Sequence, residues 1–216
     1  SKMARKMLDE AGFEDAVISA SSDLDEYLID SLKTQGAAIT SWGVGTNLIT
    51  AKDNPAFGGV YKLAAIKDDN ENFIPKIKLS ENSEKITNPG NKTVYRVYDT
   101  DGMIKADLIA LTDEVYNETD ALLLFDPVET WKKTLLRPGE YSLKEIMAPI
   151  FKDGKCIYKT PPVMDIQSYC KHELSTLWDE SKRLINPHEV HVDLSKPLYD
   201  MKQKLLNDYS KKCENE

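Results

Sequence analysis

Cysteine is scarce in this sequence, with three residues in a chain of 216. Cys156, Cys170 and Cys213 follow no regular spacing, and an odd number leaves at least one of them unpaired. This argues against the disulfide framework of small secreted proteins and predicts a chain that works in a reducing cytoplasm. The start of the chain lacks the basic and apolar regions of a signal peptide, so the sequence predicts no secretion.

Long apolar runs and an excess of positive charge are also missing. The apolar residues make up 41% of the chain and come in short runs, well below the roughly 20 residues that span a bilayer. The net charge of −8 argues against a nucleic-acid partner, because the phosphate backbone repels an acidic surface. A small phosphorylated ligand remains compatible, since it needs only a local set of donors. The sequence thus predicts a globular protein that binds neither nucleic acid nor membrane.

Several catalytic and metal motifs are absent as well. There is no Gly-x-Ser-x-Gly elbow, no Walker-type loop and no His-Glu-x-x-His. His188 and His191 stand near each other, but no further Cys or His follows at zinc-ligand spacing, and His172 lies on a charged helix. We therefore expect no metal site and no catalytic residue among the histidines, which have a structural or surface role.

What the sequence does contain is an alternating pattern over residues 1–57. It predicts a helix at 2–11, a buried strand at 17–20, a helix capped by Ser22 or Asp23 and a strand at 38–42. Such alternation with short connections indicates an α/β layer with parallel strands. Ligands gather at the carboxyl ends of strands in these folds. Two segments lie at such ends, and both are candidate binding segments.

The first candidate is Gly43-Val44-Gly45-Thr46, which directly follows the second strand. Glycines permit positive φ and a close approach to a ligand, successive N–H groups can point at phosphate oxygens, and Thr46 adds a hydroxyl. The same spacing also fits a plain tight turn that needs two glycines. Trp42, just before it, is interpreted as a core or rim residue.

The second candidate is Ser21-Ser22-Asp23, at the end of the preceding strand. If the two strands are neighbours, its side chains reach the same pocket as the glycine turn. The alternative for Ser22 is a simple helix cap. Asp23, Asp25 and Glu26 have the carboxylates that Mg²⁺ uses beside substrate phosphates, although solvated acids in a first helical turn explain them equally simply.

Beyond Pro55 the pattern changes to strands separated by turns rich in Asp, Asn, Pro and Gly. We expect an antiparallel β region over residues 59–111, then helices at 164–184 and 196–209. The boundary places one domain at 1–57 and a second at 58–216. Five basic side chains on or between the strands are either contacts for an anion or parts of solvated faces: Lys76, Lys78, Lys85, Lys92 and Arg96.

Five segments in order resemble one known family, the nicotinate phosphoribosyltransferases. Ser21 to Glu26 is similar to its Ser-Asn-Asp-Leu-Asp-Glu segment, with Ser22 where Asn is usual, and Gly43 to Thr46 is similar to its Gly-Val-Gly-Thr phosphate loop. The other three matches are Pro55 to Leu63 (Pro-x-x-Gly-Gly-Val-Tyr-Lys-Leu), Lys78 to Arg96 (Lys-x-Ser-Glu-Asn and Thr-Asn-Pro-Gly), and Lys182 to His188. Five matches in the right order are more specific than any one motif.

The resemblance implies a fold and an activity. Family members couple nicotinate to phosphoribosyl pyrophosphate, giving nicotinate mononucleotide and pyrophosphate, with ATP and Mg²⁺ as cofactors. Their fold is an irregular α/β barrel, similar to a TIM barrel, joined to a second domain. It implies that residues 1–57 are the last βα units of the barrel and that residues 58–216 form a mixed α+β C-terminal domain with antiparallel strands. A homodimer partner is implied too.

The resemblance also assigns binding residues. It implies that Gly43, Val44, Gly45 and Thr46 contact the 5-phosphate of the phosphoribosyl group, with Ser21, Ser22 and Asp23 near the same ligand. The change of Asn to Ser22 replaces an amide with a hydroxyl, so a contact made by that amide does not carry over.

The family's phosphorylated histidine, its nicotinate-binding residues and its Arg-x-Asp-Ser-Gly-Asp segment have no counterpart here. Together with a first residue that is not Met, this predicts a C-terminal piece of a longer enzyme, inactive by itself and completed by the missing N-terminal part. The alternative is a non-catalytic phosphate-binding or interaction module that keeps only the phosphate turn.

Overall fold

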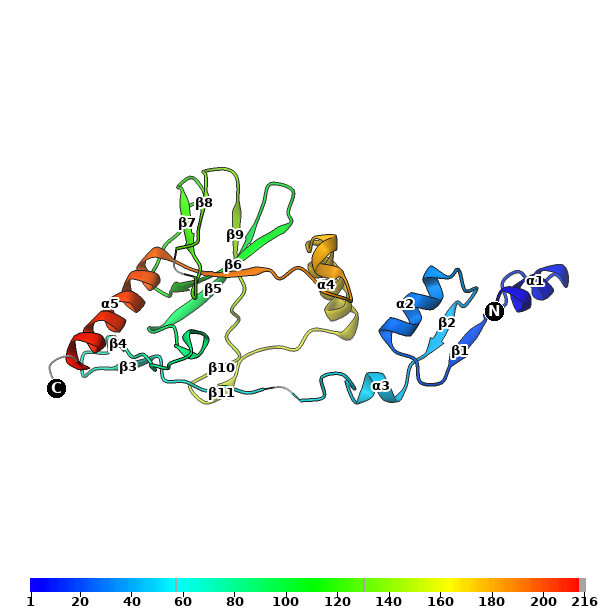
Figure 1. Ribbon diagram of the computed structural model, residues 1–216, viewed down its shortest axis with the longest axis horizontal. Helices are drawn as coiled ribbons and strands as arrows, with labels where there is room; N and C mark the ends of the chain where they lie inside the picture. The colour runs from blue at the N-terminus through cyan, green and yellow to red at the C-terminus, as the bar shows by residue number, and fades with distance from the viewer. Residues whose placement is uncertain (57, 130, 214–216) are drawn as a thin grey trace. The chain divides into compact units, whose positions relative to one another are not determined.

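The computed structural model describes residues 1–56, 58–129 and 131–213 (Figure 1). The chain divides into two compact units, residues 1–60 and residues 61–216. The sequence places the domain boundary after residue 57. Each unit is described by itself.

The first unit alternates between helices and strands (Figure 1). Its elements are α1 (Lys2–Glu10), β1 (Ser19–Ser21), α2 (Glu26–Thr34), β2 (Ser41–Gly43) and α3 (Thr46–Ile49). Strands β1 and β2 pair in parallel, which confirms the arrangement expected from the alternation. The one-turn helix α3, which begins at Thr46, was not predicted.

Little of the first unit is buried. Leu24 is 4% exposed, but Val17 is 67% exposed, and strand β1 alternates between exposed and half-buried residues. The prediction of a buried strand at 17–20 is therefore wrong, both in its burial and in its bounds. The apolar run indicated a strand correctly, but among the described residues of this unit no second layer of side chains covers it.

The N-terminal cap of α2 is Asp25 and not Ser22 or Asp23. An N-cap residue has extended backbone, and Asp25 has it, at φ −136° and ψ 176°. Its carboxylate accepts a hydrogen bond from the Leu28 N–H at 2.7 Å. Ser22 and Asp23 have φ values of 88° and 46°, which place them in the left-handed region and in the turn before the helix.

The second unit is built around a six-stranded, mostly antiparallel sheet with the order β8-β7-β12-β6-β5-β9. Only β12 and β6 pair in parallel. The strands of this sheet are β5 (Lys92–Tyr98), β6 (Ile104–Leu111), β7 (Leu122–Phe125), β8 (Lys133–Leu136), β9 (Ser142–Glu145) and β12 (His191–Leu194). The molecule thus has a mixed α/β fold, and the predicted antiparallel region is confirmed.

Two small hairpins and two helices complete this unit (Figure 1). The hairpins pair β3 (Ala65–Lys67) with β4 (Phe73–Pro75) and β10 (Phe151–Lys152) with β11 (Lys155–Cys156). The helices are α4 (Val163–Ser175) and α5 (Lys196–Cys213), and the 3₁₀ turns are η1 (Ser83–Lys85) and η2 (Asp179–Lys182). The start of the antiparallel region predicted over residues 59–111 is irregular, because residues 59–64 form no strand and pairing begins at β3.

Core clusters lie on both faces of the large sheet, because neighbouring residues of a strand point to opposite faces. Ala106, Leu108 and Ala110 of β6 belong to the cluster on one face. Helix α5 covers the other face through Leu198, which is fully buried with Phe125 and Leu194 beside Ile109 of β6. The two core clusters contain Val97, Ala106, Leu108, Ala110, Leu122, Leu124, Leu136 and Tyr141, and Phe125, Leu194 and Leu198.

The predicted helix at 164–184 ends earlier than the periodicity indicated. After Ser175 the chain turns, and the Thr176 carbonyl accepts a hydrogen bond from the Ile104 N–H at 2.8 Å. Trp178 has extended backbone, and its indole N–H donates to the Ile104 carbonyl at 3.1 Å. Contacts to the end of the sheet therefore replace the next helical turn.

The helices of the described residues were also compared with the length and hydropathy of a membrane span. None of them combines the length and the apolar character that such a span needs.

Candidate phosphate site

The two candidate segments lie side by side. Ser21 is the register partner of Gly43, so the carboxyl ends of β1 and β2 meet at one edge of the small parallel sheet. A Cβ built on Gly43 would lie 3.1 Å from the Ser21 Cβ, a distance closer than side chains normally approach. The expected juxtaposition of the segments is confirmed, and Gly43 is explained by close packing.

The expected positive φ of the two glycines is not found. Neither Gly43 nor Gly45 is among the residues with positive φ, and Gly45 has φ −110° and ψ −104°. A Cβ built on Gly45 would meet no atom within 4 Å. The space in front of Gly45 is therefore open on this chain, and a ligand can approach its backbone.

The turn offers a group of free donors. The N–H groups of Gly45, Thr46 and Asn47 donate to no acceptor among the described residues, and the same holds for the Thr46 hydroxyl. The carbonyl of Gly45 starts α3 by accepting from the Leu48 and Ile49 N–H groups. Free N–H groups are normal in the first turn of a helix. Three in a row beside an exposed hydroxyl are also what a phosphate needs.

The segment opposite the turn has an unusual backbone. Ser22 and Asp23 are consecutive non-glycine residues in the left-handed region, which costs about 1–2 kcal/mol per residue. The hydroxyls of Ser21 and Ser22 and the carboxylate of Asp23 are exposed and make no hydrogen bond with other described residues. Their polar groups are therefore available to a ligand.

Asn47 joins the two segments. Its side-chain amide donates to the carbonyls of Asp23 and Leu24, each at 3.1 Å. The sequence analysis missed this residue, although it directly follows the phosphate turn. A polar residue one position after Thr46 was the available signal.

A nearby hollow does not coincide with the predicted site. A recess of about 270 Å³ lies behind α3 and is lined by Asp25, Glu26, Asn47, Leu48, Ala51, Lys52, Asp53 and Asn54. None of the seven predicted phosphate contacts lines this recess, and its three acidic residues do not suit a phosphate. The predicted residues instead lie on open surface.

The acidic residues of the first unit do not gather into a metal site. The Asp25 carboxylate already caps α2. No group of three or more His, Cys, Asp or Glu side chains able to hold a metal ion occurs among the described residues. The described residues therefore hold no cluster of three or more metal ligands, and we assign no step to Mg²⁺ here.

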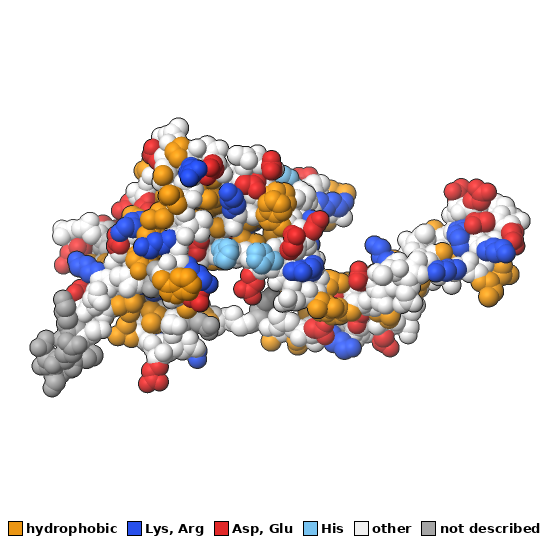
Figure 2. Space-filling view, turned by 45° about the horizontal axis from the view of Figure 1, so that its top comes forward, with side chains coloured by type: hydrophobic (Ala, Val, Ile, Leu, Met, Phe, Trp, Pro, Cys, Tyr) orange, Lys and Arg blue, Asp and Glu red, His pale blue; other side chains and the backbone are white. Residues whose placement is uncertain are grey.

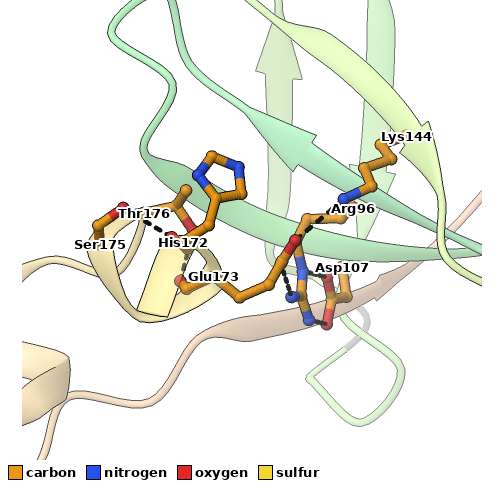
Figure 3. Close-up of polar contacts among 7 residues, drawn as sticks. All are labelled: Arg96, Asp107, Lys144, His172, Glu173, Ser175 and Thr176. Carbon is orange, nitrogen blue, oxygen red and sulfur yellow. Dashed lines mark hydrogen bonds and ion pairs between the residues drawn. The ribbon is translucent and has the colours of Figure 1, made fainter. Parts of the chain in front are cut away.

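The basic residue Arg96 is engaged within the second unit (Figure 3). Its guanidinium binds the Asp107 carboxylate through two hydrogen bonds of 2.9 and 3.1 Å and Glu173 at 3.2 Å. Lys144 donates to the other Glu173 oxygen at 2.9 Å. These contacts raise the pKa of Arg96 and lower that of Glu173. The cluster fastens α4 to β5, β6 and β9, so Arg96 is a structural residue.

The Thr-Asn-Pro-Gly stretch also has a structural role. The Lys202 ammonium, on α5, donates to the Asn88 side-chain oxygen at 2.9 Å and to the Pro127 carbonyl at 3.1 Å. Gly90 has φ 86°, and a Cβ there would lie 2.8 Å from a methyl group of Leu111. The motif thus packs α5 against the sheet.

The histidines lie at the surface, as expected. His172, His188 and His191 are all exposed, and histidine side chains are visible on the face of the second unit in Figure 2. The ring centres of His188 and His191 are 6.3 Å apart, and the rings are perpendicular.

Strand β12 also carries a buried acidic residue. Asp193 is 7% exposed, and burial raises the pKa of its carboxyl.

Comparison with known proteins decides the family. Residues 91–202 match the model of the nicotinate phosphoribosyltransferase C-terminal domain, and all of the chain aligns with nicotinate phosphoribosyltransferase of Bacillus subtilis at 46% identity. The chain belongs to the nicotinate phosphoribosyltransferase family. It covers 44% of the length of the Bacillus relative and corresponds to the C-terminal part of the family's enzymes.

More distant relatives agree with this placement. The chain is 32% identical to nicotinate phosphoribosyltransferase of Dictyostelium discoideum, with 96% of this chain and 37% of that protein aligned. A crystal structure of human nicotinic acid phosphoribosyltransferase matches 95% of this chain and 36% of its own, at a TM-score of 0.62 and 21% identity. The last comparison supports the fold. The contacts of the seven predicted residues with phosphate stay a prediction.

Proposed function

We propose that this chain is the C-terminal portion of an enzyme that joins nicotinate to phosphoribosyl pyrophosphate. The products are nicotinate mononucleotide and pyrophosphate, and ATP hydrolysis drives the reaction, which serves NAD biosynthesis. One observation carries the proposal beyond family membership. Gly43 to Thr46 and the following Asn47 form a turn in which three successive N–H groups and the Thr46 hydroxyl donate to no other described residue.

In this proposal the turn from Gly43 to Thr46 holds the 5-phosphate of the phosphoribosyl group. Backbone N–H groups and a hydroxyl bind a phosphate through directed hydrogen bonds and need no nearby cation. Ser21 and Ser22 add two hydroxyls from the neighbouring strand end. Asp23 lies beside the same ligand, with its carboxylate toward the sugar hydroxyls, because two anions repel each other.

The described residues supply binding and no catalytic group. Loss of pyrophosphate from the ribose builds up positive charge at the anomeric carbon, and a catalyst must hold the phosphates and stabilise that charge. We assign the binding of nicotinate, ATP and Mg²⁺, and the chemical step, to the part of the family's enzymes that this chain does not cover. The 216-residue chain alone is accordingly inactive in this proposal.

The first unit supplies the last βα units of the family's barrel. Two parallel strands cannot close a barrel, and each has an edge with unpaired N–H and C=O groups. Large apolar side chains of this unit are exposed, among them Met3, Met7, Val17, Leu48 and Ile49. The rest of the enzyme covers these groups, with a second copy completing a homodimer.

A chimera tests the proposal. This chain replaces the matching C-terminal part of the Bacillus subtilis relative, and the product nicotinate mononucleotide is measured in the presence of ATP and Mg²⁺. The chimera should be active, and the chain by itself should be inactive. A chimera that unfolds cooperatively and has native circular dichroism, yet forms no product, would overturn the proposal, because folding failure is then excluded.

A further inference from the structure

We infer that Asn47 is a positioning residue that holds the two halves of the phosphate site in register. The inference rests on the proposed function, because it concerns the same site. Asn47 follows Thr46 directly, and its amide reaches across to the end of β1, where it donates to two successive carbonyls. The residue therefore links the glycine turn to the Ser21-Ser22-Asp23 segment.

The contacts fix the orientation of the Asn47 amide. Both acceptors, the carbonyls of Asp23 and Leu24, lie 3.1 Å from its nitrogen. An amide turned the other way would place its oxygen against two carbonyl oxygens, which repel it. The site thus needs a donor at residue 47, and a carboxylate of the same shape cannot replace it.

The segment that Asn47 holds is the one that requires a constraint. Ser22 and Asp23 have φ values of 88° and 46°, conformations that residues other than glycine seldom adopt. Such conformations persist when surrounding contacts determine them. The bond to the Asp23 carbonyl lies at the peptide that leaves these two residues, so loss of the Asn47 donor frees the segment to relax.

The consequence for the enzyme is specific to one substrate. The Asn47 side-chain amide donates to backbone carbonyls, so this side chain acts on the ligand through Ser22 and Asp23. A relaxed segment weakens binding of the 5-phosphate end, which is remote from the reacting bond. We expect Asn47→Asp to raise the KM for phosphoribosyl pyrophosphate about fivefold, the factor of one neutral hydrogen bond. The KM for nicotinate and kcat stay within about twofold.

The test uses the active chimera with matched variants. Asn54→Asp makes the same change of charge seven residues further on, at an exposed side chain, and should leave both KM values unchanged. Asn47→Ala removes the donor without adding charge and should act in the same direction as Asn47→Asp. Hydrogen exchange of the paired strands at residues 19–21 and 41–43 in the 216-residue chain gives a second readout, and both Asn47 variants should accelerate it.

Thr46→Ala in the same series separates the two claims. If Thr46→Ala raises the KM for phosphoribosyl pyrophosphate while the Asn47 variants change neither that KM nor the exchange rate, the inference about Asn47 is wrong and the proposed function stands. If Thr46→Ala has no effect, the phosphate site itself is wrong. A rise in both KM values for Asn47→Asp would indicate general loss of structure and would overturn the positioning role.

Discussion

Ser21 and Gly43 lie directly opposite each other in the parallel pair of β1 and β2, and a Cβ on residue 43 would stand 3.1 Å from the Ser21 Cβ. Close packing between the strands therefore favours glycine at this position, and a positive φ does not. The same contact brings the two candidate segments of the phosphate site together.

Gly43→Ala should push the two strands apart. Crowding by one methyl group at a packed contact costs about 1 kcal/mol. We expect urea denaturation, followed by hydrogen exchange of the β1 and β2 segments, to show this loss. Gly59→Ala is the matched control, since a Cβ there meets no atom within 4 Å. Equal stability of the two variants would contradict the packing account.

Ser22→Asn should stabilise the first unit. Ser22 has φ 88°, and Asn tolerates the left-handed region better than Ser does. The gain should be about 0.5 kcal/mol, a part of the usual cost of that conformation. Ser21→Asn is the control, because Ser21 lies in strand β1 and has no positive φ, and it should give no gain. A loss of stability for Ser22→Asn would show that the Ser22 side chain has a structural contact.

Only part of the candidate site could be predicted from the sequence. The strand ends, the glycine turn and the neighbouring serines could be predicted, because alternation and glycine spacing are local signals. The left-handed backbone at Ser22 and the bridge from Asn47 could not, since both depend on how two separate segments meet. The cap was assigned to Ser22 or Asp23 because both residues favour that role, but these two have positive φ and Asp25 has the extended backbone of a cap.

Glu173→Gln should weaken the attachment of α4. The Glu173 side chain is 14% exposed and accepts hydrogen bonds from Lys144 and Arg96, which lower its pKa. Loss of its charge should cost about 1–2 kcal/mol at neutral pH. In the parent chain this contribution is complete above the unfolded pKa of about 4.3 and is lost as the pH falls through the lower folded pKa.

Thermal unfolding measured from pH 3 to pH 7 checks this prediction. In the parent chain, protonation of Glu173 lowers the stability as the pH falls. Glu173→Gln should lack this part of the pH dependence. Asp179→Asn serves as the control, since Asp179 makes an exposed pair with Lys182 and should contribute nothing measurable. An equal loss from both variants would contradict the structural role of the Arg96 cluster.

Asp193→Asn should stabilise the second unit at neutral pH. Burial raises the pKa of Asp193, and among the described residues its carboxylate makes no hydrogen bond or ion pair. The native state then holds this proton more tightly than the unfolded state does. Its contribution to stability therefore falls as the pH rises above the unfolded pKa of about 3.9. The variant should gain about 1 kcal/mol at pH 7 and have a flatter pH profile. Lower stability of the variant at pH 7 would contradict this.

The strands of the second unit could likewise be predicted from the sequence only in part. Strands β5 and β6 were predicted because their apolar residues alternate clearly. Strand β12 begins with His191 and pairs in parallel with β6. The partners, such as His191 and Ala106, are 85 residues apart in the chain, and no local pattern reveals such a pairing. Hairpin β10–β11 has two residues in each strand, too few for a periodic signal.

The KM for phosphoribosyl pyrophosphate in the active chimera, with and without Thr46→Ala, tests the central claim most directly. The claim is that the turn from Gly43 to Thr46 binds the phosphoribosyl 5-phosphate. Loss of one hydrogen bond to a charged group, about 1.5 kcal/mol, predicts a rise of roughly tenfold in this KM. Thr34→Ala, at the exposed end of α2, should leave it unchanged. An unchanged KM for Thr46→Ala would remove Thr46 from the site and contradict the account.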